Sequence, residues 1–186
     1  MVEIICAGFG GQGVLTAGML LINAGMEQGK QVLFYPSYGS EMRGGTANCT
    51  VKISDKQIAS PVCRQADIVL TMNAPAIDKF ESRLKPGGLL LVNTSIVPAE
   101  RTYRDDIRVV KLPVTDIAKE AGNPKGANIV MLGALAAGCD VFDPEYLKQA
   151  IVSFFEQKGK GKHNAGNIAC FDRGMQGEQD QDGGNE

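Results

Sequence analysis

Short, mostly apolar runs alternate along the chain with segments in which apolar residues recur every three to four positions. Residues 2–7 form the first run, which stops at a glycine and is typical of a strand buried in a parallel sheet. From Val14 the apolar spacing is that of an amphipathic helix, which Gly29 is placed to end. Residues 31–35 form a second apolar run, closed by a proline. The beginning of the chain therefore predicts one strand–helix–strand unit of a doubly wound sheet.

The same alternation continues through most of the remaining chain. Asn128 and Pro144 are placed to mark the beginnings of two helices, as an N-cap and a first helical residue. Strands that alternate with helices predict an α/β fold of the Rossmann-like, doubly wound kind, with a mostly parallel sheet and helices on both faces. The further strands are expected at 46–53, 68–72, 89–92 and 108–112, and the further helices at 75–84, 115–121, 129–137 and 144–155.

One segment is expected to depart from the parallel pattern. Residues 46–53 alternate between polar and apolar side chains, and residues 54–56, Ser-Asp-Lys, are typical of a turn. Residues 57–60 could then return as a second short strand. This predicts a short antiparallel hairpin within the otherwise parallel sheet.

The sequence predicts a single Rossmann-like domain at residues 1–173, with a possible last strand at 167–171. After Arg173 the chain is glycine-rich and acidic and contains no lysine or arginine. We expect residues 174–186 to form a disordered acidic tail, because they hold few apolar side chains to bury.

Composition limits the classes of function. The formal net charge is −2, which gives no basic surface for a nucleic acid. The 5 cysteines are scattered and include no C-x-x-C pair, so we expect neither a zinc site, nor iron–sulfur ligands, nor a disulfide framework. No apolar run approaches the ~20 residues that span a bilayer. These features favour a protein of the reducing cytoplasm that makes no contact with membranes.

Residues 8–13, Gly-Phe-Gly-Gly-Gln-Gly, carry the strongest chemical signal, because they directly follow a predicted strand and precede a predicted helix. Glycines let the backbone approach an anion, and the N-terminus of a helix offers free N–H groups and the positive end of its dipole. A tight turn without a ligand is the alternative. Four glycines in six residues exceed what a turn needs, which favours a phosphate-binding loop.

The neighbouring residues narrow the choice of phosphate ligand. A dinucleotide site needs an acidic residue about 20 positions on, at the end of the second strand, to hold a ribose. No acidic residue lies between Gln28 and Ser40, which disfavours a nicotinamide dehydrogenase. Gly13 is followed by Val14 and not by lysine, which excludes a P-loop nucleotide hydrolase.

A second glycine-rich segment, residues 38–45, follows the second strand and contains Arg43. In a parallel sheet this segment lies at the same carboxyl edge as the first glycine loop. Two glycines follow Arg43, so its guanidinium could remain accessible to a phosphate or a carboxylate. The residues leave open an alternative in which Arg43 pairs with Glu41 in a surface loop.

Other polar residues offer less chemistry. His163, the only histidine, lies among glycines and lysines and is expected in a solvated loop. Arg101, Arg104, Arg108 and Lys111 are interspersed with aspartates, and we expect them to form a solvated face. The chain shows neither paired carboxylates nor a Ser/His/Asp arrangement, so we assign no catalytic and no metal-binding residue.

Three segments, residues 8–16, 36–49 and 65–70, together resemble the gamma subunit of 2-oxoacid:ferredoxin oxidoreductases. The first motif alone is weak, whereas the first and second at this separation are specific. The resemblance extends from Val2 to Arg173. Within the family, the second motif is more similar to the 2-oxoglutarate (2-ketoglutarate) type than to the pyruvate type.

The resemblance implies one subunit of a heteromeric complex that decarboxylates a 2-oxoacid oxidatively with coenzyme A, giving acyl-CoA, CO2 and reduced ferredoxin. It implies that this subunit covers the active site and helps to bind coenzyme A. Thiamine diphosphate, Mg and the iron–sulfur clusters are then expected on partner subunits only. The positions implied to hold the coenzyme A phosphates are Gly8, Gly10, Gly11, Gln12, Gly13 and Arg43. The residues by themselves also allow a stand-alone, non-catalytic nucleotide-binding module.

Overall fold

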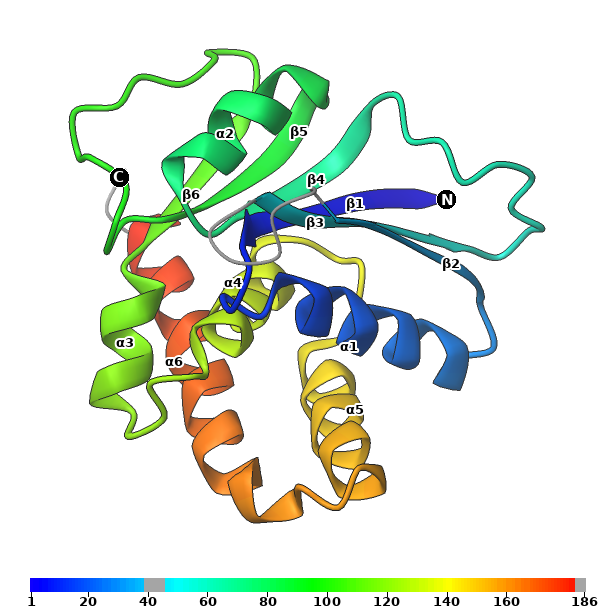
Figure 1. The fold of residues 1–186 in the computed structure, drawn as a ribbon, viewed down its shortest axis with the longest axis vertical. Coiled ribbons are helices and arrows are strands. Elements are labelled where there is room, and N and C mark those ends of the chain that lie inside the picture. Colours follow the sequence, from blue (N-terminus) through cyan, green and yellow to red (C-terminus); the bar gives the residue numbers. More distant parts are fainter. Residues whose placement is uncertain (39–45, 183–186) are drawn as a thin grey trace.

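The computed structural model describes residues 1–38 and 46–182, and in this part of the chain six strands form one sheet (Figure 1). Their order is β2-β3-β1-β4-β5-β6. The pairs β1–β4, β4–β5 and β5–β6 are parallel, whereas β3 is antiparallel to both β1 and β2. The predicted, mostly parallel sheet is confirmed. The strands are β1 (Val2–Phe9), β2 (Gln31–Tyr38), β3 (Thr46–Ser54), β4 (Ala66–Thr71), β5 (Leu84–Asn93) and β6 (Arg108–Leu112).

The antiparallel strand pairs differently from the prediction. Residues 57–60 form no strand, so the expected hairpin within 46–60 is wrong. The reason is that β3 already pairs along both of its edges, with β2 on one side and β1 on the other. The antiparallel element of this fold is therefore β3 itself, inserted between two strands that run the other way.

Helices cover both faces of the sheet, as the sequence predicts (Figure 1). The larger core lies between one face and helices α1, α3, α4, α5 and α6. The smaller core lies on the other face, under α2 and the segment 94–107. The helices are α1 (Val14–Glu27), α2 (Ala74–Phe80), α3 (Val114–Glu120), α4 (Ala127–Gly138), α5 (Pro144–Gln157) and α6 (Asn164–Asp182), with short 3₁₀ helices η1 (Glu81–Arg83) and η2 (Gly161–His163).

Several expected helix boundaries shift by a few residues. Leu84, expected at the end of a helix, begins β5. Asn128 lies inside α4, whose N-cap position is Gly126. Pro144 is at the beginning of α5 as predicted, where the Asp143 side chain accepts a 2.9 Å hydrogen bond from the Tyr146 amide. Among the described residues, no helix is long and apolar enough to cross a membrane.

The C-terminal prediction is wrong for the residues that the structure describes. The expected strand at 167–171 and the first part of the expected disordered tail, 174–182, both belong to the helix α6. Gly174 permits this arrangement, because a Cβ there would stand 2.0 Å from the Val130 carbonyl oxygen. Glu178 is only 2% exposed and forms an ion pair with Arg108. Glycines that indicate a loop in the sequence instead allow two helix backbones to approach.

Candidate functional site

The glycine loop joins the end of β1 to the beginning of α1, as predicted. Gly13 occupies the N-cap position in the left-handed conformation, with a φ of 74°. No side chain caps this helix, and its first turn contains no acidic residue. The N–H groups of the first turn, which have no partner within a helix, are therefore left for an external acceptor.

The glycines of the loop have two different roles. A Cβ at Gly8 would stand 2.9 Å from the Met72 Cβ, so this glycine is required for close packing. A Cβ at Gly13 would stand 2.8 Å from the amide of Asn128. Gly11 has a φ of 94°, and no atom would lie within 4 Å of a Cβ there. Gly10 and Gly11 are both exposed. The outer part of the loop is thus open, and the inner part is held in place by packing.

The Gln12 side chain turns inward and braces the loop. Its Oε1 accepts hydrogen bonds from the Phe9 amide at 2.7 Å and from Asn73 Nδ2 at 2.9 Å. Its Nε2 donates to the Met72 carbonyl oxygen at 3.3 Å. The sequence places Gln12 among the phosphate ligands. These hydrogen bonds give it a positioning role within the chain.

Three asparagines that sequence reasoning missed as site residues support the same edge of the sheet. Asn73 caps α2 by accepting from the Ala76 amide at 2.9 Å, while its Nδ2 contacts Gln12. Asn93, at the end of β5, donates to Thr115 Oγ1 at 2.9 Å. Asn128 Nδ2 donates to the Gly13 carbonyl oxygen at 3.1 Å. The available signal was an asparagine at or directly after two successive parallel strands, where polar side chains reach the carboxyl edge.

The strand ends that flank the second glycine-rich motif lie beside the end of β1 and the first glycine loop. Thr46 pairs with Phe9, and Ala47 pairs with both Gly8 and Tyr38. The strand ends on either side of the motif therefore meet at the carboxyl edge, as predicted. Residues 39–45, with Arg43, lie outside the described residues.

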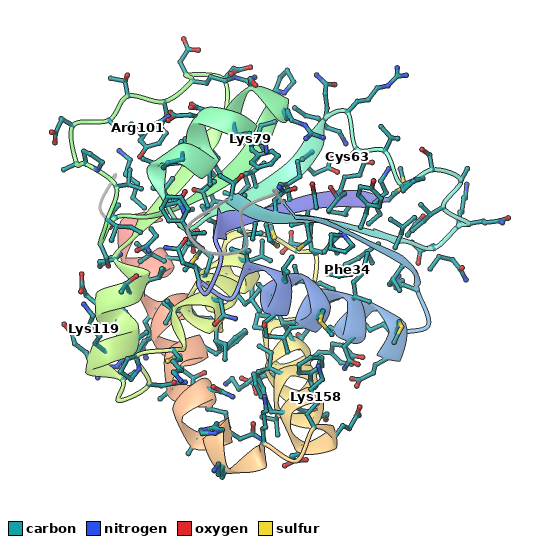
Figure 2. All side chains as sticks on the ribbon, viewed as in Figure 1. Phe34, Cys63, Lys79, Arg101, Lys119 and Lys158 are labelled. Carbon is teal, nitrogen blue, oxygen red and sulfur yellow. The ribbon has the colours of Figure 1, made fainter. Side chains whose placement is uncertain are left out.

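The remaining polar candidates are exposed or paired within the chain. His163 is exposed in η2, far along the chain from the glycine loop. Arg101, labelled in Figure 2, pairs with Asp78 at 2.7 Å, and Arg104 pairs with Asp106 at 2.6 Å. The pKa of the Asp106 carboxyl is lowered because Arg104 donates hydrogen bonds to it. Arg101 and Arg104 thus pair near the surface, as expected for this cluster, whereas Arg108 pairs with the buried Glu178 of α6.

The five cysteines are free thiols, four of them buried and Cys139 partly buried. Cys6 and Cys49 face each other across β1 and β3, and both are buried. The pKa of Cys6 is raised well above its usual range by a hydrogen bond with Cys49 and by burial. Burial likewise raises the pKa of Cys63, Cys139 and Cys170. In the part of the chain that the structure describes, no three His, Cys, Asp or Glu side chains gather as a metal site requires.

Comparison with known proteins identifies relatives over almost the whole chain. The family model for pyruvate ferredoxin/flavodoxin oxidoreductase matches residues 3–177. Ketoisovalerate oxidoreductase subunit VorA of Methanothermobacter marburgensis is 38% identical over 160 residues, which are 86% of this chain and 33% of that protein. The chain thus spans about a third of the length of this relative.

Two further relatives match along nearly their full length. The 2-oxoglutarate synthase subunit KorC of Methanocaldococcus jannaschii is 35% identical over 176 residues, covering 94% of this chain and 92% of that protein. The solved gamma subunit of a keto/oxoacid ferredoxin oxidoreductase from Geobacter sulfurreducens superimposes with a TM-score of 0.81 at 30% identity, covering 97% of this chain and 99% of that chain. The chain therefore belongs to the pyruvate ferredoxin/flavodoxin oxidoreductase family.

Proposed function

We propose that this chain is the gamma-type subunit of a heteromeric 2-oxoacid:ferredoxin oxidoreductase. Such a complex converts a 2-oxoacid and coenzyme A to acyl-CoA and CO2 and reduces ferredoxin. The observation that carries the proposal is the end-to-end match with separate subunits of the same size, KorC and the Geobacter gamma subunit. The match covers only 33% of the VorA relative, so in that protein the same domain is one part of a larger chain.

The proposed substrate is 2-oxoglutarate. The motif that spans residues 36–49 favours this type, and one full-length relative is named for 2-oxoglutarate synthase. Ketoisovalerate is the rival substrate, because VorA is named for it. The two acids differ by a second carboxylate, so they can be separated by direct assay of the assembled complex.

The proposed contribution of this subunit is to bind coenzyme A and to cover the active site. Gly10 and Gly11 are exposed above the N-terminus of α1, and the space in front of Gly11 is open. A diphosphate can therefore approach the backbone N–H groups where the positive end of the helix dipole favours an anion. Arg43 is proposed to pair with a phosphate from the second motif. No acidic side chain between Gln28 and Ser40 offers a partner for the ribose of NAD.

The proposed complex places the redox chemistry on other subunits. The described part of this chain offers neither a catalytic set nor a cluster of metal ligands. A hydrogen bond with Cys49 and burial raise the pKa of the Cys6 thiol, and burial raises the pKa of Cys63, whereas iron–sulfur clusters are bound by thiolates. Thiamine diphosphate, Mg and the iron–sulfur clusters are therefore assigned to partner subunits, and ferredoxin reaches this chain only through the complex.

A pull-down from the native host tests the assembly. The expected result is that tagged chain recovers partner subunits with thiamine diphosphate and iron in fixed ratios, and that the complex oxidises 2-oxoglutarate faster than ketoisovalerate. Recovery of the chain alone would favour the stand-alone nucleotide-binding module. A complex that prefers ketoisovalerate would support the proposed assembly and overturn the proposed substrate.

Coenzyme A titration of the assembled complex tests the ligand. Arg43→Ala should raise the coenzyme A KM about ten- to a hundredfold, because a charge-assisted hydrogen bond contributes about 1.5–3 kcal/mol. Gly10→Val should raise it further by blocking the approach of the phosphate. Gly29→Val is the control away from the loop, because Gly29 lies beyond the opposite end of α1 and no atom would lie within 4 Å of a Cβ there. Unchanged coenzyme A kinetics in both loop variants, or tight NAD binding, would reject this ligand.

A further inference from the structure

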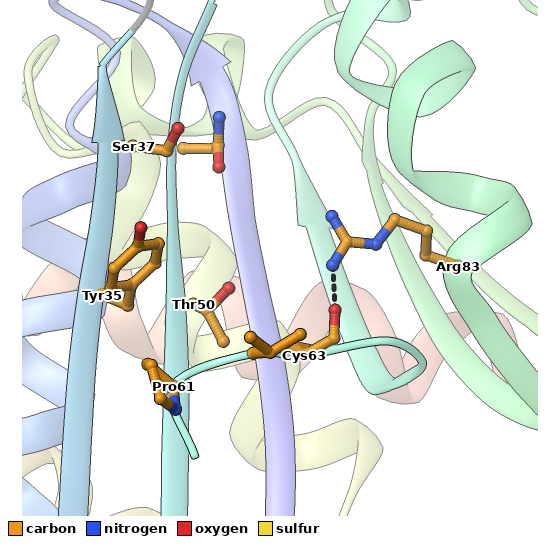
Figure 3. Close-up of a pocket in the computed structure, with 8 residues that line it drawn as sticks. Tyr35, Ser37, Thr50, Pro61, Cys63 and Arg83 are labelled. Carbon is orange, nitrogen blue, oxygen red and sulfur yellow. Dashed lines mark hydrogen bonds between the residues drawn. The ribbon is translucent and has the colours of Figure 1, made fainter.

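A pocket with several polar side chains lies on the sheet face opposite α1 (Figure 3). Its volume is about 230 Å³. On this face α2 packs over β1 and β4, and the pocket lies beside it over β2 and β3. The lining residues are Tyr35, Ser37, Asn48, Thr50, Pro61, Val62, Cys63 and Arg83.

Two of the lining side chains are polar, and only a small fraction of each residue is exposed. Asn48 is 9% exposed and Thr50 is 8% exposed. Neither side chain hydrogen-bonds to another group in the described part of the chain. The neighbouring residues Cys49 and Val51 face α1, so alternation along β3 directs Asn48 and Thr50 into the pocket. Among the described residues, neither Asn48 nor Thr50 has a fully buried side-chain atom that lacks a hydrogen bond, so their polar atoms remain accessible within the pocket to an entering group.

The pocket also contains a fixed cation. Arg83 Nη2 donates a hydrogen bond to the Cys63 carbonyl oxygen, and its guanidinium carbon lies 5.5 Å from the centre of the Phe80 ring. These two contacts orient the guanidinium and leave other N–H donors unused (Figure 3). Within the described residues, Arg83 forms no ion pair with a carboxylate, and no acidic residue lines the pocket.

Every polar side chain that lines the pocket can donate a hydrogen bond. Three are hydroxyls (Tyr35, Ser37 and Thr50), one is the amide of Asn48 and one is the guanidinium of Arg83. A pocket lined by hydrogen-bond donors, with one positively charged side chain and no negatively charged one, is suited to an anion with several acceptor oxygens. The volume is below the 300–1,000 Å³ that is typical for drug-sized ligands, so a small molecule or the end of a larger one fits.

We propose that this pocket binds a small oxyanion, the carboxylate or phosphate group of a metabolite, which Arg83 pairs with and which Asn48 and Thr50 hydrogen-bond. The pocket lies on the sheet face opposite α1 and extends along β3 from Asn48, which pairs with Ala7 next to Gly8, to Thr50. Thr50 lies opposite Ile5, three residues before Gly8, which corresponds to about 10 Å along the strand. The oxyanion could belong to a free acid or to the phosphate of a cofactor, and the test distinguishes these two ligands.

The test is isothermal titration of the full chain at low salt with inorganic phosphate, 2-oxoglutarate and coenzyme A, each separately. Wild type should bind at least one of these probes. Arg83→Gln should weaken that binding at least tenfold. Thr50→Val, which keeps the shape of the side chain, should weaken it severalfold. Lys79→Gln is the matched control, since Lys79 also lies over the Phe80 ring, at 5.3 Å, but does not line the pocket (Figure 2).

The outcomes separate the two sources and the null result. Binding of phosphate or 2-oxoglutarate that depends on Arg83 and Thr50 assigns the pocket to a free anion. Binding of coenzyme A alone, with the same dependence, assigns it to a cofactor phosphate. Absence of binding by all three probes, or equal losses in Arg83→Gln and Lys79→Gln, would overturn the proposal. Because Gly10→Val leaves this pocket intact, failure of the glycine-loop proposal would not affect the result.

Discussion

Asn128 Nδ2 donates a 3.1 Å hydrogen bond to the carbonyl oxygen of Gly13, and the same side chain fills the space where a Cβ of residue 13 would lie. The two residues are 115 positions apart in the sequence. This contact joins the beginning of α4 to the loop that precedes α1. The helix therefore determines where the inner part of the glycine loop can lie.

Gly13→Ala should destabilise the chain by more than backbone strain alone. The left-handed conformation costs a residue with a Cβ about 1–2 kcal/mol, and overlap with Asn128 should add about 1–3 kcal/mol. Gly29→Ala is the control, because its φ of 70° matches the 74° of Gly13 and no atom lies within 4 Å of its Cβ. Urea unfolding measures both. Equal losses of unfolding free energy in the two variants would show that Asn128 can move aside without loss of stability. In an Asn128→Ala background, the loss from Gly13→Ala should fall close to that of the control.

The buried ion pair between Glu3 and Lys52 should be far more sensitive than a surface pair. Glu3 and Lys52 lie directly opposite each other on β1 and β3, with side chains that are 12% and 4% exposed, and Lys52 also donates to the Val62 carbonyl oxygen at 2.7 Å. Lys52→Met leaves the carboxylate buried without a partner, which should cost about 3–5 kcal/mol. Urea unfolding checks this value.

Two variants test the origin of that loss. Glu3→Gln combined with Lys52→Met should recover most of the stability, because no unpaired charge remains. Lys30→Met removes the partner of the exposed Asp55 and should leave the urea midpoint nearly unchanged. If the double variant is as unstable as Lys52→Met, the loss comes from packing and not from charge.

Removal of residues 174–186 should destabilise the chain. Deletion takes away the buried Glu178 and leaves Arg108 without this partner, and it uncovers α4 at Val130. We expect a loss of at least about 3 kcal/mol, which corresponds to a fall in Tm of about 6–12 °C for a chain of this size. Gly174→Val should also lower Tm, because its side chain would meet the α4 backbone. Gln176→Ala, on the exposed side of α6, is the neutral control. A Tm unchanged by the deletion would contradict the packing of α6.

Stability should fall as the pH rises above about 9, the ordinary pKa of a free thiol. The hydrogen bond with Cys49 and burial raise the pKa of Cys6 in the folded chain, so the unfolded chain loses its proton first. The stabilisation is complete below that pH and declines above it, by at most about 1.4 kcal/mol per pH unit for one group. Urea unfolding at pH 8 and 10, under reducing conditions, should show a shallower decline in Cys6→Ala. Identical slopes would exclude Cys6 as a source.

The parallel sheet and the glycine loop could be predicted because their signals are local. A buried strand, four glycines and an apolar helical spacing follow one another within the first 25 residues, and each indicates the same unit. The roles of Gln12 and Asn128 could not be predicted. Their partners, Asn73 and Gly13, are 61 and 115 residues away, and only the folded sheet brings them together.

The two wrong predictions have different physical causes. Residues 57–60 have the composition of a short strand, but strand pairing is a property of the whole sheet, and β3 has no free edge. Gly166, Gly174 and Gly177 make residues 164–182 look like a loop and a tail. In the fold these glycines make room for close contacts with Asn123 at Gly166, with the α4 backbone at Gly174 and with Leu112 of β6 at Gly177, which no periodicity within the segment reveals.

The crossing of α4 and α6 makes the surroundings of the glycine loop depend on a segment that follows it much later in the sequence. A Cβ at Gly133 would lie 2.1 Å from the Phe171 carbonyl oxygen, so α4 lies directly against α6. The same helix α4 carries Asn128, which donates to the Gly13 carbonyl oxygen. During synthesis the glycine motif emerges before α6 does. A translation product that stops before α6 would therefore carry the complete motif, while α4 lacks the helix against which it packs.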